Sequence, residues 1–193
     1  TSVTMTYEPT SSANYVVQFD DADYLIFKNM TFTATGTYNG RVFDFLDGSH
    51  NITLDSNIIN GISATYTSTN LAVIYLASST ENNHITISNN EINNGSYGLY
   101  LFGTSTSNLE QACVISNNII QDFHSYGMYL YNLDSVVVSS NLISAKLTGG
   151  NSTQYGIYAR YCDNGSEFSK NNIRVYASTT NYGMYIYNCD GTS

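Results

Sequence analysis

Tyrosine is the residue whose type and spacing in this sequence could support chemistry. Five tyrosines each lie at the centre of a triplet with apolar flanks, as in Leu99-Tyr100-Leu101, and these triplets recur along the chain. Alternate side chains of a strand point to opposite faces, so we expect the flanking residues to point inward and the tyrosine outward. A phenol combines a flat apolar ring with a hydroxyl, which suits the faces and hydroxyl groups of sugars. The five residues are Tyr75, Tyr100, Tyr129, Tyr158 and Tyr185.

A second set of outward residues follows two positions after the first. If the coils of the chain stack about 4.8 Å apart, both sets form one broad aromatic strip. Two interpretations stay open at this point. Either the strip binds a glycan, or the tyrosines only stabilise the sheet by ring contacts or lie beneath a neighbouring domain. The second set adds Phe102, Tyr131 and Tyr187 to the predicted glycan-binding residues, and Arg160 lies in the same column.

Carboxylates and bases that could act on a sugar are scarce on this face. Asp20 and Asp44 lie near Arg41 at one end. Arg160 lies about four coils further on, which is on the order of 20 Å at the spacing of a parallel sheet. Lyases and hydrolases need their carboxylates and basic groups within one site. We therefore assign no catalytic residue and favour a non-catalytic module, with a polysaccharide lyase or hydrolase as the alternative.

The sequence predicts no cofactor and no metal ligand, and calcium is the one cation that it leaves open. A column of aspartates at one turn position either attracts such a cation or bonds to its own turn backbone. The three histidines occupy different positions of the repeat, which is typical of solvated turn residues. The aspartates are Asp23, Asp134, Asp163 and Asp190, and the histidines are His50, His84 and His124.

Two of the three cysteines share a column. Cys162 and Cys189 occupy the same position in neighbouring coils. That separation permits a disulfide, but parallel side-chain directions favour a reduced internal stack.

The elements that would position these residues are short strands in a repeat. Runs of the type ITISNNEI (Ile85 to Ile92) occur six times in all, and their aligned asparagines are 33, 28, 23 and 30 residues apart. A constant run with variable spacing indicates stacked coils whose loops differ in length. We expect three strands per coil: the tyrosine triplet, the run before the asparagine and the run after it. The aligned residues are Asn57, Asn90, Asn118, Asn141 and Asn171, with Met30 in the first coil.

Composition narrows the class of protein. The chain has 193 residues, of which 42% are hydrophobic, so it can bury the core of a single domain. Only 11% of the residues are charged, and the eighteen tyrosines accompany many residues that favour strands and turns. A net charge of −9 argues against a nucleic-acid partner and against binding to anionic membranes. No apolar run approaches the roughly 20 residues that span a bilayer, so we expect no membrane insertion.

In its alternating runs and its asparagine column, the sequence resembles the right-handed parallel β-helix repeats of the pectate-lyase-like superfamily, as found in long exported bacterial proteins. The resemblance spans nearly the whole chain. It implies an all-β fold, a right-handed parallel β-helix that is a single-stranded solenoid of about six to seven coils, with three short strands per coil. It also implies that the five asparagines bond from coil to coil at the bend between the second and third strands, and that the first-strand face holds a polysaccharide. Asparagine suits this bend because it tolerates left-handed backbone.

We therefore predict one β-helix domain over residues 1–193, a fragment of a longer chain that is open at both ends. The expected function is a non-catalytic, adhesin-like module, extracellular or on a cell surface, which presents its tyrosine-rich face to a glycan or another surface. Its expected partners are a polysaccharide or cell-surface glycan and the flanking domains of the same chain. A purely structural stalk segment is a further alternative.

Overall fold

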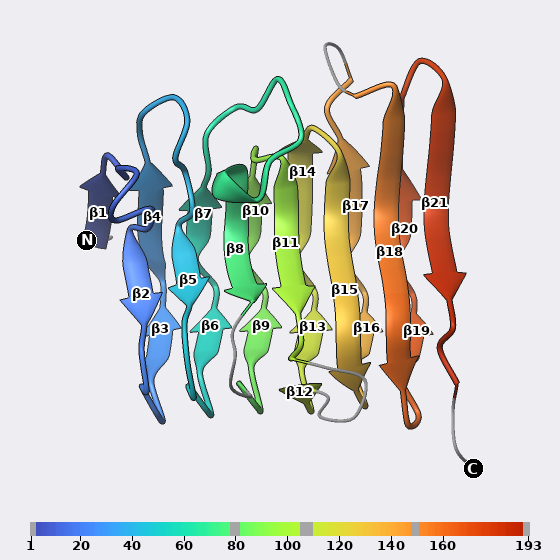
Figure 1. The fold of residues 1–193 in the computed structure, drawn as a ribbon, viewed down its shortest axis with the longest axis horizontal. Helices are drawn as coiled ribbons and strands as arrows, with labels where there is room; N and C mark the ends of the chain where they lie inside the picture. Colours follow the sequence, from blue (N-terminus) through green and yellow to red (C-terminus); the bar gives the residue numbers. More distant parts are fainter. Residues whose placement is uncertain (1–2, 78–81, 105–109, 148–150, 191–193) are drawn as a thin grey trace.

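The computed structural model describes residues 3–77, 82–104, 110–147 and 151–190. Within these residues the backbone forms three parallel sheets, and neighbouring strands of a sheet come from successive coils (Figure 1). The 3-10 turn η1 (Thr69–Leu71) is the one helical segment in the described part of the chain, where no helix is long and apolar enough to cross a membrane. The predicted all-β parallel β-helix with three strands per coil is confirmed.

We number the sheets in the order in which each coil visits them. Sheet 1 contains β2 (Val17–Phe19), β5 (Phe43–Phe45), β8 (Ala72–Ala77), β11 (Tyr97–Phe102), β15 (Tyr126–Asp134), β18 (Thr153–Asp163) and β21 (Thr180–Tyr187), with β12 (Glu110–Gln111) paired to β15. Sheet 2 contains β3 (Ile26–Lys28), β6 (Thr53–Asp55), β9 (Thr86–Ser88), β13 (Val114–Ser116), β16 (Val137–Ser139) and β19 (Glu167–Ser169). Sheet 3 contains β1 (Val3–Tyr7), β4 (Met30–Ala34), β7 (Ile58–Asn60), β10 (Glu91–Asn93), β14 (Ile119–Phe123), β17 (Leu142–Ala145) and β20 (Asn172–Arg174).

The winding is right-handed. In Figure 1 the strands of sheet 1 run downward on the near side, and those of sheets 2 and 3 run upward behind them, while the chain advances from left to right. This is the hand that parallel strands joined by crossovers almost always adopt, because of the right-handed twist of each strand.

The interior is filled by the apolar residues at alternate strand positions. Along sheet 2 the register places four of them over one another, and each is 0% exposed; they are Leu54, Ile87, Ile115 and Val138. Burying one such side chain contributes roughly 1.5–3 kcal/mol, so the stacked columns are the main source of stability.

The bend between sheets 2 and 3 holds a ladder of asparagine side chains. Asn118 Oδ1 accepts hydrogen bonds from Asn90, from its backbone N–H at 2.9 Å and from Nδ2 at 3.1 Å. Asn118 Nδ2 donates to the Ile87 carbonyl at 2.8 Å and to Asn141 Oδ1 at 3.0 Å. Equivalent coil-to-coil bonds join Asn57 to Asn90 and Asn141 to Asn171.

The left-handed backbone of this bend belongs to the residue before each ladder asparagine. We expected the ladder asparagine itself to adopt it, and this expectation was wrong. The ladder position suits an amide because Oδ1 accepts two bonds from one neighbouring coil while Nδ2 donates both to the other neighbouring coil and to a backbone carbonyl. The preceding position accepts several residue types, with φ between 55° and 58° in Ser56, Asn89, Asn117 and Lys170 and of 59° in Ser140.

Replacing Asn118 by alanine should lower the free energy of unfolding by about 1–3 kcal/mol, because buried partners in two neighbouring coils would lose their hydrogen bonds. Urea unfolding followed by circular dichroism measures the change. Asn172→Ala is the matched control, because Asn172 is exposed and bonds to the Asn141 carbonyl through its backbone N–H at 2.8 Å. Equal stability of the two variants would contradict the role of the ladder.

Candidate functional site

The first tyrosine column lies on the outer face of sheet 1. Its neighbouring rings are stacked, with centroids 4.8–5.3 Å apart and planes within 13° of parallel. The rings are half-buried, whereas the flanking residues Leu99 and Leu101 are fully buried. The side chains therefore point outward. Strand register places the column over five successive coils in the order Tyr75, Tyr100, Tyr129, Tyr158 and Tyr185.

A second column of tyrosines lies beside the first, and we did not predict it from the sequence. Its rings stack with centroids 4.7–4.8 Å apart and planes within 9° of parallel. The signal was the recurring motif Tyr-Gly-apolar-Tyr, but strict alternation would direct its first tyrosine into the core. The members of this column are Tyr97, Tyr126, Tyr155 and Tyr182.

The glycine of this motif turns the first tyrosine outward. A Cβ added at Gly127 would lie 2.5 Å from Ile143 Cγ2 in the core and 2.6 Å from the Gly156 carbonyl oxygen. The glycine therefore faces the interior, and so does the apolar residue after it, Met128, which is 0% exposed. With two successive residues facing inward, the alternation slips by one position, as in a β-bulge, and the tyrosine before the glycine joins the outer face.

The two columns interlock edge to face. Tyr126 meets Tyr129 at a centroid distance of 5.5 Å and an angle of 85°, and it meets Tyr158 at 6.1 Å and 87°. Within a column each central ring has a neighbouring ring on both faces. The parts left to solvent are therefore ring edges and hydroxyl groups. This differs from the flat stacking platform that the sequence led us to expect.

The hydroxyls of the central tyrosines are available to a ligand. In the described part of the chain, the hydroxyls of Tyr100, Tyr126 and Tyr129 form no hydrogen bond with another residue. None of them is among the buried polar atoms that lack a partner, so these hydroxyls reach solvent. Each can donate one hydrogen bond and accept others.

Burial among the rings raises the pKa of these tyrosines. Desolvation disfavours the phenolate, and the neighbouring phenols add to the effect. Together they raise the pKa of Tyr126 to about 12, and they raise the pKa values of Tyr97, Tyr100 and Tyr129 in the same direction. The hydroxyls therefore stay protonated as donors well above neutral pH.

Phe102, Tyr131 and Tyr187, the second set of residues predicted from the sequence, are linked by ring stacking and by contacts with the Arg160 cation. Phe102 and Tyr131 stack at 4.5 Å. The Arg160 guanidinium lies 5.4 Å from the Tyr131 ring centre and 5.0 Å from that of Tyr187, and it donates to the Tyr161 hydroxyl at 3.0 Å. Tyr187 thus joins the strip through Arg160 by cation–π contact.

A polar cavity of about 310 Å³ lies at the N-terminal end of the strip. Arg41 lines it and covers Tyr75, with 3.3 Å from the guanidinium carbon to the ring centre. Arg41 also forms an ion pair with Asp44 Oδ1 at 3.0 Å, and Gln18 donates to Asp44 Oδ2 at 2.9 Å. Both oxygens of this buried carboxylate are thus engaged, and the exposed Asp20 takes no part in these contacts. The arrangement is that of a structural ion pair.

Two members of the aspartate column bond to the backbone of a neighbouring coil, and Asp134 accepts from the Ser135 hydroxyl at 3.4 Å. Asp23 accepts from the His50 N–H at 2.8 Å, and Asp163 accepts from the Asp190 N–H at 2.7 Å. In the described ranges, no group of three or more His, Cys, Asp or Glu side chains is placed to hold a metal ion. Calcium binding stays a prediction.

The histidines do not all occupy solvated turns. His84 is exposed, and His50 Nδ1 accepts from the Asn83 N–H at 3.1 Å. His124 is buried, at 5% exposed, and its carbonyl accepts from Gln154 Nε2 at 3.3 Å. The expectation of a solvated turn was wrong for His124 because the neighbouring coil covers it.

Comparison with known proteins shows little similarity. No family model and no curated protein matches the sequence. One solved structure with a related course of the backbone is that of the Streptococcus pneumoniae surface protein and adhesin PfbA, with a TM-score of 0.46 and 11% identity. The match covers 89% of this chain and 66% of that chain, which is just under two thirds. At this level of similarity the match carries no argument about function.

Stability should fall as the pH rises above 10. Tyrosine in the unfolded chain loses its proton near 10.0, whereas Tyr126 in the folded protein keeps it to about 12. Between these values the folded state binds more protons, so the free energy of unfolding decreases with pH. Urea unfolding at intervals through this window measures the decrease.

An absorbance titration of tyrosinate provides the internal control. A separate late transition should appear in the titration, because burial raises the pKa of Tyr97, Tyr100, Tyr126 and Tyr129. A single transition near 10 for all eighteen tyrosines would contradict the burial that we describe.

Proposed function

We propose that this chain is a non-catalytic, extracellular module that binds a glycan along its tyrosine face, which we define as the two tyrosine columns together with Phe102, Tyr131 and Tyr187. The observation that carries the proposal is the continuous double column of half-buried rings with solvent-facing hydroxyls.

The exposed chemistry of this face suits an oxygen-rich ligand. An aromatic ring is negative on its face and positive at its edge. Since the ring faces lie against one another, the surface presents positive edges together with hydroxyls that donate and accept. Sugars offer ring oxygens and hydroxyl groups that complement both features.

The length and charge of the face favour an extended ligand of low charge. The first column spans four coil steps, roughly 19 Å at the strand spacing of a sheet, so repeated weak contacts can add along a polymer. The two tyrosine columns contain no charged side chain, Arg41 at one end is neutralised by Asp44, and the Arg160 cation lies outside them, beside Tyr131 and Tyr187. Binding through the two columns should therefore depend little on salt.

The remaining parts of the proposal rest on the sequence resemblance. Membership of the pectate-lyase-like superfamily, export from a bacterium and flanking domains in the same chain would place the module on or outside the cell. An adhesin-like role would follow from binding a surface glycan.

A structural stalk is the second candidate, and one observation favours it. The rings of the two tyrosine columns already pack against one another. Each central ring is stacked on both faces and contacts a ring of the other column edge to face. Such packing stabilises a parallel sheet without any ligand. The two candidates differ in what the hydroxyls do.

A triple variant separates the ring contacts from the hydroxyls. Tyr100→Phe, Tyr126→Phe and Tyr129→Phe together keep the stacked rings and remove three free hydroxyls. If these hydroxyls bind a glycan, affinity for a ligand found on a glycan array should fall by roughly tenfold or more, at about 0.5–1.5 kcal/mol per hydrogen bond. Thermal unfolding should change little.

The matched control carries the same substitution at three exposed tyrosines outside the face. These are Tyr24, Tyr38 and Tyr66. Their phenylalanine variant should bind like the wild type. An empty array for the wild type would support the stalk, and equal affinity of both triple variants would contradict binding through the tyrosine hydroxyls.

A further inference from the structure

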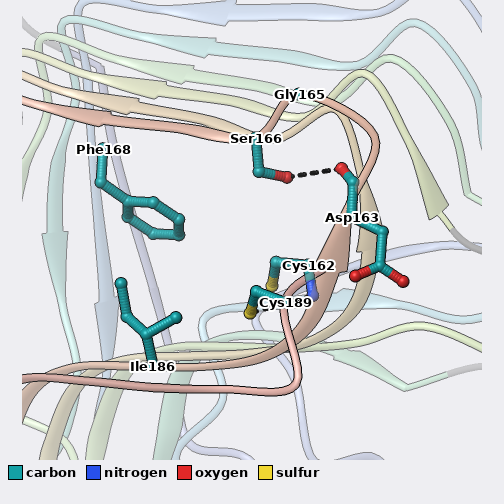
Figure 2. A pocket seen from close by; sticks show the side chains of 7 residues that line it. All are labelled: Cys162, Asp163, Gly165, Ser166, Phe168, Ile186 and Cys189. Carbon is teal, nitrogen blue, oxygen red and sulfur yellow. Dashed lines mark hydrogen bonds between the residues drawn. The ribbon is translucent and has the colours of Figure 1, made fainter. Parts of the chain in front are cut away.

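A second cavity, of about 240 Å³, opens into the interior of the solenoid at its C-terminal coils. Cys162 and Cys189 line one side of it, and Phe168 and Ile186 lie across from them (Figure 2). All three cysteines of the chain are free thiols, as the sequence led us to favour. The cavity belongs to the interior and not to the tyrosine face, so it is independent of the proposed function.

Two neighbouring coils bring these cysteines to the same position. β18 and β21 pair in register up to Arg160 and Tyr187, and each cysteine follows two residues later. The intervening residues, Tyr161 and Asn188, are both left-handed, with φ of 52° and 48°. Matching bends direct both thiols into the cavity. Neighbouring strands lie about 4.8 Å apart, which is within the Cα separation of about 4.4–6.8 Å that a disulfide spans.

The two thiols are close and have different environments. The Cys162 backbone N–H donates to Cys189 Sγ at 3.3 Å. Cys162 is 2% exposed, and its Sγ lies 3.8 Å from the carbonyl oxygens of Leu130 and Arg160. Cys189 is only half-buried. Cys189 is therefore the thiol that a reagent in solution reaches first.

Hydrogen bonding makes Cys189 the better nucleophile as well. Hydrogen bonding from Cys162, whose backbone N–H donates to Cys189 Sγ, lowers the pKa of Cys189 despite its partial burial. The same pairing and burial raise the pKa of Cys162. A thiolate is the attacking species in disulfide exchange, so Cys189 is the first reacting group.

We propose that Cys162 and Cys189 form an inter-coil disulfide by exchange with a low-molecular-weight disulfide of the glutathione class. The Cys189 thiolate attacks one sulfur, the S–S bond of the reagent breaks, and one thiolate leaves. Cys162 then gives up its proton and attacks Cys189 Sγ, which expels the second thiolate. The cysteine pair loses two electrons and two protons, and the reagent gains them as two thiols.

The bond would secure the last described coil. Among the described strands, β21 pairs with β18 alone, and its residues Met184, Ile186 and Tyr187 are 40–50% exposed. The disulfide would close a loop between residues 27 positions apart, which restricts the unfolded chain and holds β21 to its neighbour.

The test treats the folded protein with oxidised glutathione and follows intact mass. The wild type should lose two hydrogens and yield a linked Cys162–Cys189 peptide on digestion. Cys162→Ser should instead gain one glutathionyl group on Cys189, because the resolving thiol is missing. Cys189→Ser should stay unmodified. Cys113, which is 1% exposed in the core, is the internal control and should not react.

A second measurement does not depend on the variants. Oxidised wild type should unfold at a higher urea concentration than reduced wild type, and dithiothreitol should reverse the gain. A folded wild type that keeps all thiols, or that carries two glutathionyl groups and no internal link, would overturn the proposal. So would reaction of Cys162 in the folded Cys189→Ser variant.

Discussion

Parallel strand pairing between successive coils is the constraint on which the rest of the structure depends. Each complete coil contributes strands to all three sheets, and the backbone bonds of those sheets hold each strand residue over its equivalent in the next coil. A strand side chain therefore lies against the side chains at the same position of the neighbouring coils, about 4.8 Å away. Columns of like residues, rather than individual contacts, are the units of stability and of surface chemistry.

This constraint favours side chains that can pack against copies of themselves. Asparagine amides do so because each donates to and accepts from the next, as Asn118 does with Asn90 and Asn141. Aromatic rings do so by offset stacking. Stacked like charges repel one another, and Asp134 beside Asp163 in the aspartate column is an exception to this preference. The low fraction of charged residues, 11%, is consistent with this, and Arg160 lies between two aromatic rings of its column rather than beside another cation.

The tyrosine face and the cysteine pair both result from the stacking of equivalent positions in successive coils. The tyrosine face lies on the outer surface, and the cysteine pair lies in the interior. On the outside, glycines remove the Cβ that would collide with the core, so that a second tyrosine column reaches the surface and packs edge to face with the first. On the inside, matching left-handed residues, Tyr161 within β18 and Asn188 just after β21, bring two thiols together. The tyrosine columns present hydroxyls to solvent. The stacked cysteines place the buried thiol of Cys162 next to the accessible thiol of Cys189.

The sequence by itself determined the coil, its three strands, the asparagine column and the first tyrosine column, because alternation and repeat spacing are properties of a single strand and of its copies. Only the tertiary structure decided the side on which Tyr97 and Tyr126 lie, because that depends on how closely Gly98 and Gly127 approach atoms of other coils. It also decided that His124 is buried, that ring edges rather than faces are exposed, and that Cys189 contacts Cys162. These properties arise from the distances between coils, which no local pattern of residues contains.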